Sequence, residues 1–234
     1  MNRFATRMIV LLVAFVALAA STGVSSAALR APQVAVLGGS LQAYFSSIGE
    51  TINVNTQQDA AQTWTRTIST NSAVSLLIEQ TPSAGVNTIG LYNGSAAVPT
   101  LYPVLPGAAA PGWFAQVSFR ISPDRVVVNL FDNNALPVSS NTYFGIDATN
   151  FGFYISGPNG TFYQQDARNP GAKAQLLSYA GSGVNAGTWF LAFEEAAVAL
   201  GSDQDFDDSV VQVESMNPTP VSSTTWGSLK SRFR

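Results

Sequence analysis

Residues 151–163, FGFYISGPNGTFY, carry the clearest fold signal in this chain. Phe151, Phe153 and Ile155 alternate with other residues, which places them on one face of a β-strand. The Asn159-Gly160 pair that follows adopts positive φ readily, so a tight hairpin into a second strand is expected. The stretch therefore predicts two antiparallel strands joined by a short turn.

Similar short runs of β-branched and aromatic residues, separated by Gly, Pro and Asn, continue along the chain. They predict strands at 73–80, 88–92, 113–121, 125–131, 142–146, 151–156, 161–164, 175–179, 189–193 and 209–214. Ser122-Pro123-Asp124 predicts a turn between two of these strands. Their number and spacing predict an all-β fold, a β-sandwich of jelly-roll-like kind. No helix stands out between residue 28 and the C-terminal tail.

The first 27 residues have the pattern of a cleaved secretory signal peptide. Arg3 and Arg7 precede the apolar run 8–20, and the small residues Ser25 and Ala27 occupy the −3 and −1 positions of a cleavage site. The apolar run has 13 residues, whereas a bilayer span needs about 20. We therefore expect a secreted or cell-surface protein whose mature chain has no integral membrane span.

The remaining chain divides into one domain and a tail. Residues 28–215 are expected to form a single β-sandwich domain, because no linker interrupts them. Residues 216–234 are predicted to be a linker followed by a short basic amphipathic segment, in which Trp226, Leu229 and Phe233 share one helical face. This tail is a candidate sorting or docking signal, with a frayed chain end as the alternative.

The composition excludes several kinds of chemistry. The chain has no Cys and no His, so thiol catalysis, a Ser-His-Asp triad and His-ligated or thiolate-ligated metals are excluded. Residues 28–234 contain 14 acidic and 9 basic residues, and this acidic balance argues against nucleic acid as a partner. Seven of the acidic residues lie between Glu194 and Glu214 with no Lys or Arg among them.

That acidic segment is the strongest functional signal. Asp203, Asp205 and Asp207 alternate, Asp208 follows directly, and the pair Glu194-Glu195 ends the preceding predicted strand. Crowded carboxylates repel one another unless a cation compensates their charge. Calcium accepts six to eight oxygen ligands in loose geometry, so it is the expected cofactor. The alternative interpretation is a solvated acidic surface loop.

An EF-hand does not fit this segment. Asp203, Asp205, Asp207 and Glu214 match loop positions 1, 3, 5 and 12, but Asp208 stands where that loop needs Gly. An extended strand at 209–214 would also carry Glu214 roughly 20 Å away from Asp208. Glu194 or Glu195, at the end of the neighbouring strand of a hairpin, is the better additional ligand.

These segments resemble a family of bacterial secreted proteins. The residues that carry the resemblance are FGFYISGPNGTFYQQD (151–166), Asn169-Pro170-Gly171, TWFLAFEE (188–195) and SDQDFDDSVVQVE (202–214). They are similar to a C-terminal domain of unknown function with an AFED…DxDFND signature, common in PEP-CTERM and other exported surface proteins. The resemblance covers residues 142–214 and implies an extracellular, calcium-binding β-sandwich with no established enzymatic activity.

Carried over by position, the signature places the metal ligands at six residues. These are Glu194, Glu195, Asp203, Asp205, Asp207 and Asp208. The chain departs from the signature at Glu195, where Asp is usual, and at Asp207, where Asn is usual, but both residues keep oxygen ligands. No second apolar helix follows Glu214, so the membrane anchor of PEP-CTERM proteins is not expected.

Two other functions remain open at this point. Aromatic side chains could stack on sugars in a carbohydrate-binding module, although in sandwiches most aromatic residues belong to the core. The candidates are Tyr92, Tyr102, Trp113, Tyr154 and Tyr163. A glycoside hydrolase needs a carboxylate pair, which the neighbourhood of Glu194 and Asp205 offers.

The leading hypothesis combines these observations. The sequence predicts a secreted or cell-surface, non-catalytic, calcium-binding β-sandwich of the matrix or adhesion kind. Extracellular polysaccharide or surface matrix components are the expected partners. Calcium would join two strand ends by cancelling the repulsion between their carboxylates.

Overall fold

The computed structural model describes residues 40–67, 71–81 and 83–219, which form two antiparallel sheets and one short helix. The first sheet contains β1 (Gln58–Asp59), β3 (Asn71–Ile78), β6 (Phe114–Ile121), β7 (Asp124–Phe131), β8 (Pro137–Phe144), β11 (Leu176–Ala180), β12 (Thr188–Phe193) and β13 (Ser209–Glu214). The second contains β2 (Trp64–Arg66), β4 (Thr88–Asn93), β5 (Leu101–Leu105), β9 (Phe151–Gly157), β10 (Gly160–Tyr163) and β14 (Met216–Pro218).

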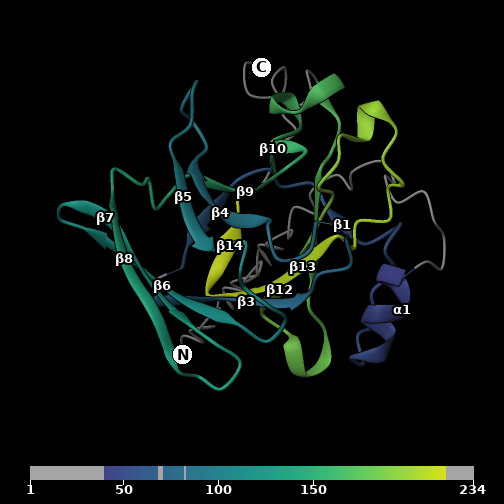
Figure 1. Ribbon diagram of the computed structural model, residues 1–234, viewed down its shortest axis with the longest axis horizontal. Helices are drawn as coiled ribbons and strands as arrows, with labels where there is room; N and C mark the ends of the chain where they lie inside the picture. The colour runs from purple at the N-terminus through teal and green to yellow at the C-terminus, as the bar shows by residue number, and fades with distance from the viewer. Residues whose placement is uncertain (1–39, 68–70, 82, 220–234) are drawn as a thin grey trace, which may run out of the picture.

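The two sheets stack on one another, and the predicted all-β sandwich is confirmed (Figure 1). The eight-stranded sheet has the order β1-β11-β12-β13-β3-β6-β7-β8. The six-stranded sheet has the order β14-β2-β9-β4-β5, with β10 also paired to β9. β13, the last strand of the larger sheet along the chain, therefore lies between β12 and β3, far from either edge.

Both predicted turns join paired strands. Gly157 of β9 pairs with Gly160 of β10, which leaves Pro158 and Asn159 as a two-residue turn. Ile121 of β6 pairs with Asp124 of β7 around Ser122-Pro123, whose peptide bond is cis. The turn residues thus predicted both hairpins correctly.

A core of buried side chains lies between the two sheets, and we call it the inner core. The residues at its centre include Trp64, Val117, Phe151, Phe153 and Leu191. Phe151 and Phe153 face this core from β9, as the alternation predicted. Burial of each such aromatic side chain stabilises the fold by about 2–3 kcal/mol.

A second core, the outer core, covers the opposite face of β11, β12 and β13. Helix α1 (Ser40–Ser47) supplies Leu41 and Phe45, and the Phe45 ring lies 5.3 Å from the Tyr179 ring and 5.2 Å from the Phe190 ring. Phe190 belongs to the outer core and its neighbour Leu191 to the inner core. This end of the larger sheet is therefore buried on both faces, with α1 beside it (Figure 1).

Several boundaries differ from the predictions. The prediction of no helix after residue 28 was wrong, because α1 forms at Ser40–Ser47. Three strands were not predicted: β1 and β2, which precede residue 73, and β5, which contains Pro103. β8 begins at Pro137 rather than at residue 142. β14 pairs with β2, so the sheet continues past residue 215, where the linker was expected to begin.

Short 3-10 turns complete the described chain. They are η1 (Asp166–Arg168), η2 (Pro170–Ala172), η3 (Gly183–Asn185) and η4 (Val198–Leu200). Among residues 40–67, 71–81 and 83–219, no helix is long and apolar enough to cross a membrane. The predicted signal peptide at 1–27 and the amphipathic tail at 225–234 lie outside the described residues.

Candidate metal centre

The acidic segment connects two neighbouring strands of the larger sheet. Phe193 at the end of β12 pairs with Ser209 at the start of β13, which confirms the predicted hairpin between these strands. Residues 194–208 form the connection, so Glu194 and Asp208 lie side by side where the two strands part. Register alone therefore brings the carboxylates of both ends to the same place.

The connecting loop is fixed to the body of the protein at two points. Gln175 is buried, and its amide donates to the carbonyl of Ala196 and accepts from the N–H of Val198. Phe206 is fully buried in the outer core. These contacts hold the loop against β11, β12 and α1.

Left-handed residues alternate with aspartates in this loop. Gln204 and Phe206 have φ values of 58° and 57°, which cost of order 1 kcal/mol each for residues with a Cβ. This coiled path folds the chain back on itself between Asp203 and Asp207. Together with the sheet register, it gathers the carboxylates that the alternating Asp pattern indicated.

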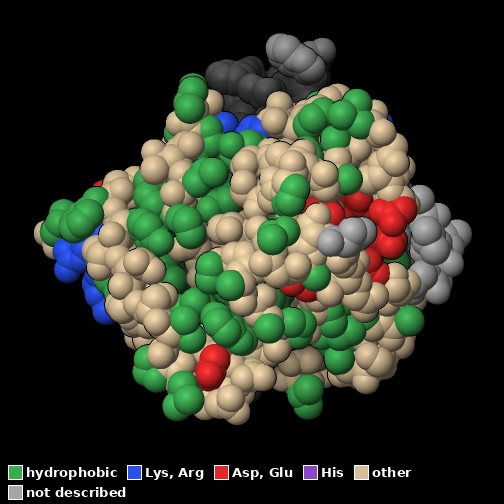
Figure 2. Space-filling view, viewed as in Figure 1, with side chains coloured by type: hydrophobic (Ala, Val, Ile, Leu, Met, Phe, Trp, Pro, Cys, Tyr) green, Lys and Arg blue, Asp and Glu red, His purple; other side chains and the backbone are tan. Residues whose placement is uncertain are grey.

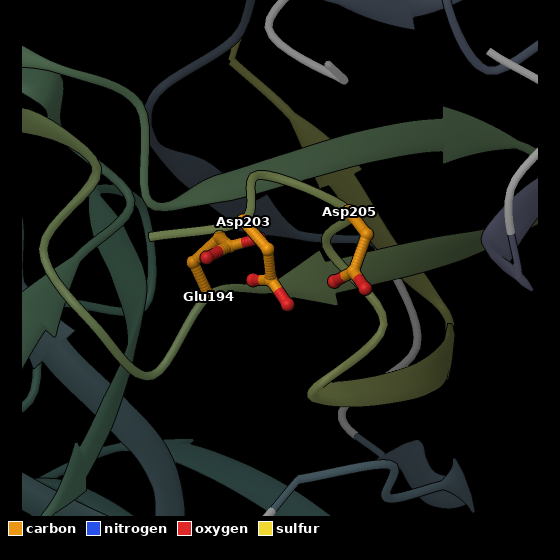
Figure 3. Close-up of side chains that lie close together, drawn as sticks. All are labelled: Glu194, Asp203 and Asp205. Carbon is orange, nitrogen blue, oxygen red and sulfur yellow. The ribbon is translucent and has the colours of Figure 1, made fainter. Parts of the chain in front are cut away.

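A first group consists of Glu194, Asp203 and Asp205, whose carboxylate oxygens lie within 4.8 Å of one another (Figure 3). Glu194 has an exposed fraction of 0%. Its Oε1 accepts the N–H of Phe206 at 2.8 Å, whereas no described residue donates a hydrogen bond to its buried Oε2. A buried carboxylate oxygen without a donor is costly, so this atom requires a cation or a proton.

A second group consists of Asp205, Asp207 and Asp208, again with oxygens within 4.8 Å of one another. Asp207 and Asp208 are both buried. Asp208 Oδ2 accepts the N–H of Glu195 at 2.8 Å, and the backbone N–H of Asp207 donates to Asp205 Oδ1 at 3.4 Å. Asp205 is common to both groups.

Burial is the main cause of the raised pKa values in this cluster. It raises the pKa of Glu194 to about 8, although the N–H of Phe206 and the nearby Ser202 hydroxyl oppose the shift. Burial also raises the pKa of Asp208 to about 7, and repulsion from Glu195 and from Asp205 adds to the effect. The pKa of Asp205 is raised by burial and by its neighbour Asp207.

Among the described residues, no positive side chain offsets this charge. None of the carboxylates in the two groups forms an ion pair with a described Lys or Arg, and Figure 2 shows acidic side chains gathered with no basic ones among them. At 4.8 Å, two unit charges repel by about 3.5 kcal/mol at an effective dielectric constant of about 20. The ionised cluster is therefore strained, and a divalent cation would relieve it.

Glu195 lies outside both groups. Its carboxylate accepts hydrogen bonds from the side-chain amides of Asn87 and Asn159, the latter at 3.4 Å. Five of the six predicted ligands therefore lie in the two groups, and the sixth, Glu195, is hydrogen-bonded to side-chain amides. Asn87 and Asn159 were missed by the sequence analysis, because no local pattern shows that β4 and the β9–β10 turn reach this site.

An open cleft of about 450 Å³ adjoins the cluster. Its lining residues are Ser83, Asn159, Glu195, Ala196, Asp203 and Asp208. Asp203 belongs to the first group and Asp208 to the second. Solvent and small solutes in the cleft can therefore approach both groups.

The other sequence candidates lie elsewhere. Glu214 is exposed at the opposite end of β13, as expected for a residue that cannot join the cluster. Of the aromatic candidates for sugar stacking, Tyr92, Tyr102 and Tyr154 are buried and Trp113 and Tyr163 are half-buried. Buried rings cannot stack on a ligand, so these three belong to the protein interior.

Comparisons with protein-family models, with curated proteins and with solved structures find no match to this chain. The resemblance to exported surface proteins thus stays a prediction from the residues that carry it. The assignment of a function depends on the geometry of the acidic cluster.

Proposed function

We propose that this chain is a secreted or cell-surface, non-catalytic, calcium-binding β-sandwich of the matrix or adhesion kind. Calcium would bind where β12 and β13 part and would hold the connecting loop against the sheet. The observation that carries the proposal is the buried Oε2 of Glu194, to which no described residue donates a hydrogen bond. It belongs to a carboxylate that has an oxygen within 4.8 Å of an oxygen of Asp203 and of Asp205.

The chemistry of the donors favours calcium among the common cations. Both groups consist of carboxylates, and the chain has no His or Cys to attract softer metals. Magnesium demands near-ideal octahedral geometry, whereas calcium tolerates irregular sets of oxygen ligands. An irregular loop with an adjoining cleft for water suits calcium better.

The accessibility of the acids argues against hydrolysis. A general acid with a pKa near 8 would suit glycoside hydrolysis, and Glu194 has such a pKa. However, a substrate atom must contact the acid, and the Glu194 side chain has no exposed surface. A binding role for the cluster therefore explains its burial, and catalysis does not.

The proposed location and partner rest on the sequence alone. The N-terminal residues have the pattern of a secretory signal, and calcium is abundant outside cells, where such a site would stay filled. Extracellular polysaccharide or surface matrix components remain the proposed partners, and the open cleft beside the cluster is where such a ligand would contact the protein.

A thermal unfolding experiment tests the proposal. A ligand that binds only the folded state raises its stability by mass action, by about 2.7 kcal/mol at a hundred times the dissociation constant. We expect calcium to raise Tm relative to protein in chelator and Asp205→Asn to abolish the rise. Asp124→Asn, at the exposed β6–β7 turn, is the matched control and should respond like the wild type. Equal Tm values in calcium and chelator would contradict the proposal.

A further inference from the structure

The five clustered carboxylates form two groups, or centres, rather than one. Glu194 and Asp203 form a group with Asp205, and Asp207 and Asp208 form another group with the same Asp205. Within each group the ligand atoms lie within 4.8 Å of one another, but the five do not unite into a single group at that distance. A single ion could therefore contact one group fully and the other only in part.

Each of the two groups contains a buried carboxylate. In the first it is Glu194, whose Oε2 is buried and accepts no hydrogen bond from a described residue. In the second it is Asp207, which has an exposed fraction of 3% and lies beside Asp205 and Asp208. Buried charges in proteins are paired, coordinate metals or are neutralised by a proton, and an ion at each group would compensate both sets of ionised carboxylates.

We propose that the cluster holds two calcium ions, one among Glu194, Asp203 and Asp205 and one among Asp205, Asp207 and Asp208. This inference rests on the proposed function and specifies its stoichiometry. Asp205 belongs to both groups, so its carboxylate would be shared by the two ions.

The charge of the cluster agrees with two ions. Five ionised carboxylates carry five negative charges, so one divalent ion would leave three uncompensated and two ions would leave one. The described part of the chain places no Lys or Arg in contact with the cluster to compensate the remainder. With the carboxylates ionised, a second divalent ion supplies most of the missing positive charge.

The cleft supplies the rest of both coordination shells. Asp203 of the first centre and Asp208 of the second both line it, together with the exposed amide of Asn159. Calcium takes six to eight oxygen ligands, and each centre provides three carboxylates. Water in the cleft can complete the coordination of each ion.

Ion counting by native mass spectrometry, at calcium concentrations ten times the wild-type dissociation constant, tests the inference. We expect two ions on the wild type, one on Asp203→Asn and one on Asp207→Asn. Asp205→Asn should bind at least tenfold more weakly at both centres, and Asp124→Asn should keep two ions.

The outcomes separate the inference from the proposed function. A single ion on the wild type, lost in both Asp203→Asn and Asp207→Asn, would overturn the pair of ions and leave calcium binding intact. No ion on the wild type would overturn both. Circular dichroism of each variant in chelator checks that the fold is retained, so that a lost ion reports on the ligand and not on unfolding.

Discussion

Glu50 and Glu194 are both buried glutamates, yet their surroundings affect them in opposite ways. The Glu50 carboxylate accepts hydrogen bonds from the N–H and hydroxyl of Ser182 and from the Asn185 amide, at 2.6–2.7 Å. Burial alone would raise the pKa of Glu50, but these three donors lower it below its ordinary value. Glu194 has one donor and an unpartnered oxygen, and its pKa rises to about 8.

Burial of a carboxylate therefore does not by itself indicate a cation site. Glu50 joins the segment after α1 to the η3 turn, and its charge is satisfied by donors from the protein. Glu194 accepts the N–H of Phe206 and otherwise lies among carboxylates. What distinguishes the proposed metal centre is the oxygen without a described donor, and four experiments test this contrast.

The largest expected effect is the pH dependence of the metal-free protein. The pKa values of Glu194 and Asp208 are about 8 and 7 in the folded state, above ordinary carboxyl values. The folded state therefore holds these two protons more tightly than the unfolded state does. The resulting stabilisation is present below pH 4 and is lost as pH rises through 7 and 8. We expect unfolding in chelator to become easier by on the order of 5 kcal/mol between pH 5 and pH 8.5.

Calcium should remove this decline, because the ion favours the ionised carboxylates. Glu50 works in the opposite sense, since a lowered pKa stabilises the fold above pH 4.5 and the gain is lost in acid. Denaturant titrations at several pH values, with chelator and with calcium, measure both. A flat profile in chelator between pH 5 and pH 8.5 would refute the account of Glu194.

Phe206 tests whether the loop must be held in place for the ions to bind. Phe206→Ala removes a fully buried ring from the outer core and should cost about 4 kcal/mol of stability. Phe153→Ala, in the inner core, is the matched control with a similar cost. We expect calcium affinity, measured by calorimetric titration, to fall at least tenfold only in the Phe206 variant. Phe206→Leu permits the same measurement with a smaller loss of stability.

Replacing each glutamate by its amide tests the comparison directly. At pH 8.5 in chelator, Glu194→Gln should stabilise the protein by about 3 kcal/mol, because it removes a buried charge. Glu50→Gln should destabilise it by about 2 kcal/mol, because charge-assisted hydrogen bonds are weakened. Only the Glu194 variant should lose its response to calcium. If both variants shifted Tm in the same direction, the proposed difference between Glu50 and Glu194 would be refuted.

The smallest effect is expected at Glu195. Its carboxylate is bound by the Asn87 and Asn159 amides and belongs to neither group, so it resembles Glu50 more than its neighbour Glu194. Glu195→Gln should keep both ions and change the calcium dissociation constant by less than about threefold, roughly 0.6 kcal/mol. A complete loss of calcium binding would show that Glu195 is a ligand after all.

Much of the fold was predictable because its signals are local. Alternation at Phe151, Phe153 and Ile155 gave β9, and turn residues gave both hairpins. Helix α1 is only eight residues long, rich in Ser, and stabilised mainly by docking Phe45 on β11 and β12. β5 was hidden by Pro103, which an edge strand tolerates because its N–H is not needed.

The sequence predicted which acidic residues meet at the site but not their hydrogen-bond partners. The alternating aspartates and the adjacent strand ends indicated which residues would meet, because they are close in sequence or in register. The separate environments of Glu194 and Glu195 depend on residues about 12 and 108 positions away, Phe206 and Asn87. Such partners are set by tertiary packing, which no local pattern encodes.

The central position of β13 bears on how the chain folds. β3 pairs with β13, more than a hundred residues later, so the larger sheet stays divided until nearly the whole domain has been synthesised. The aspartates immediately precede this last long strand, and its pairing with β12 sets Asp208 beside Glu194. We therefore expect closure of the sheet and completion of the carboxylate cluster to be one late folding event, which a chain truncated before residue 209 would not complete.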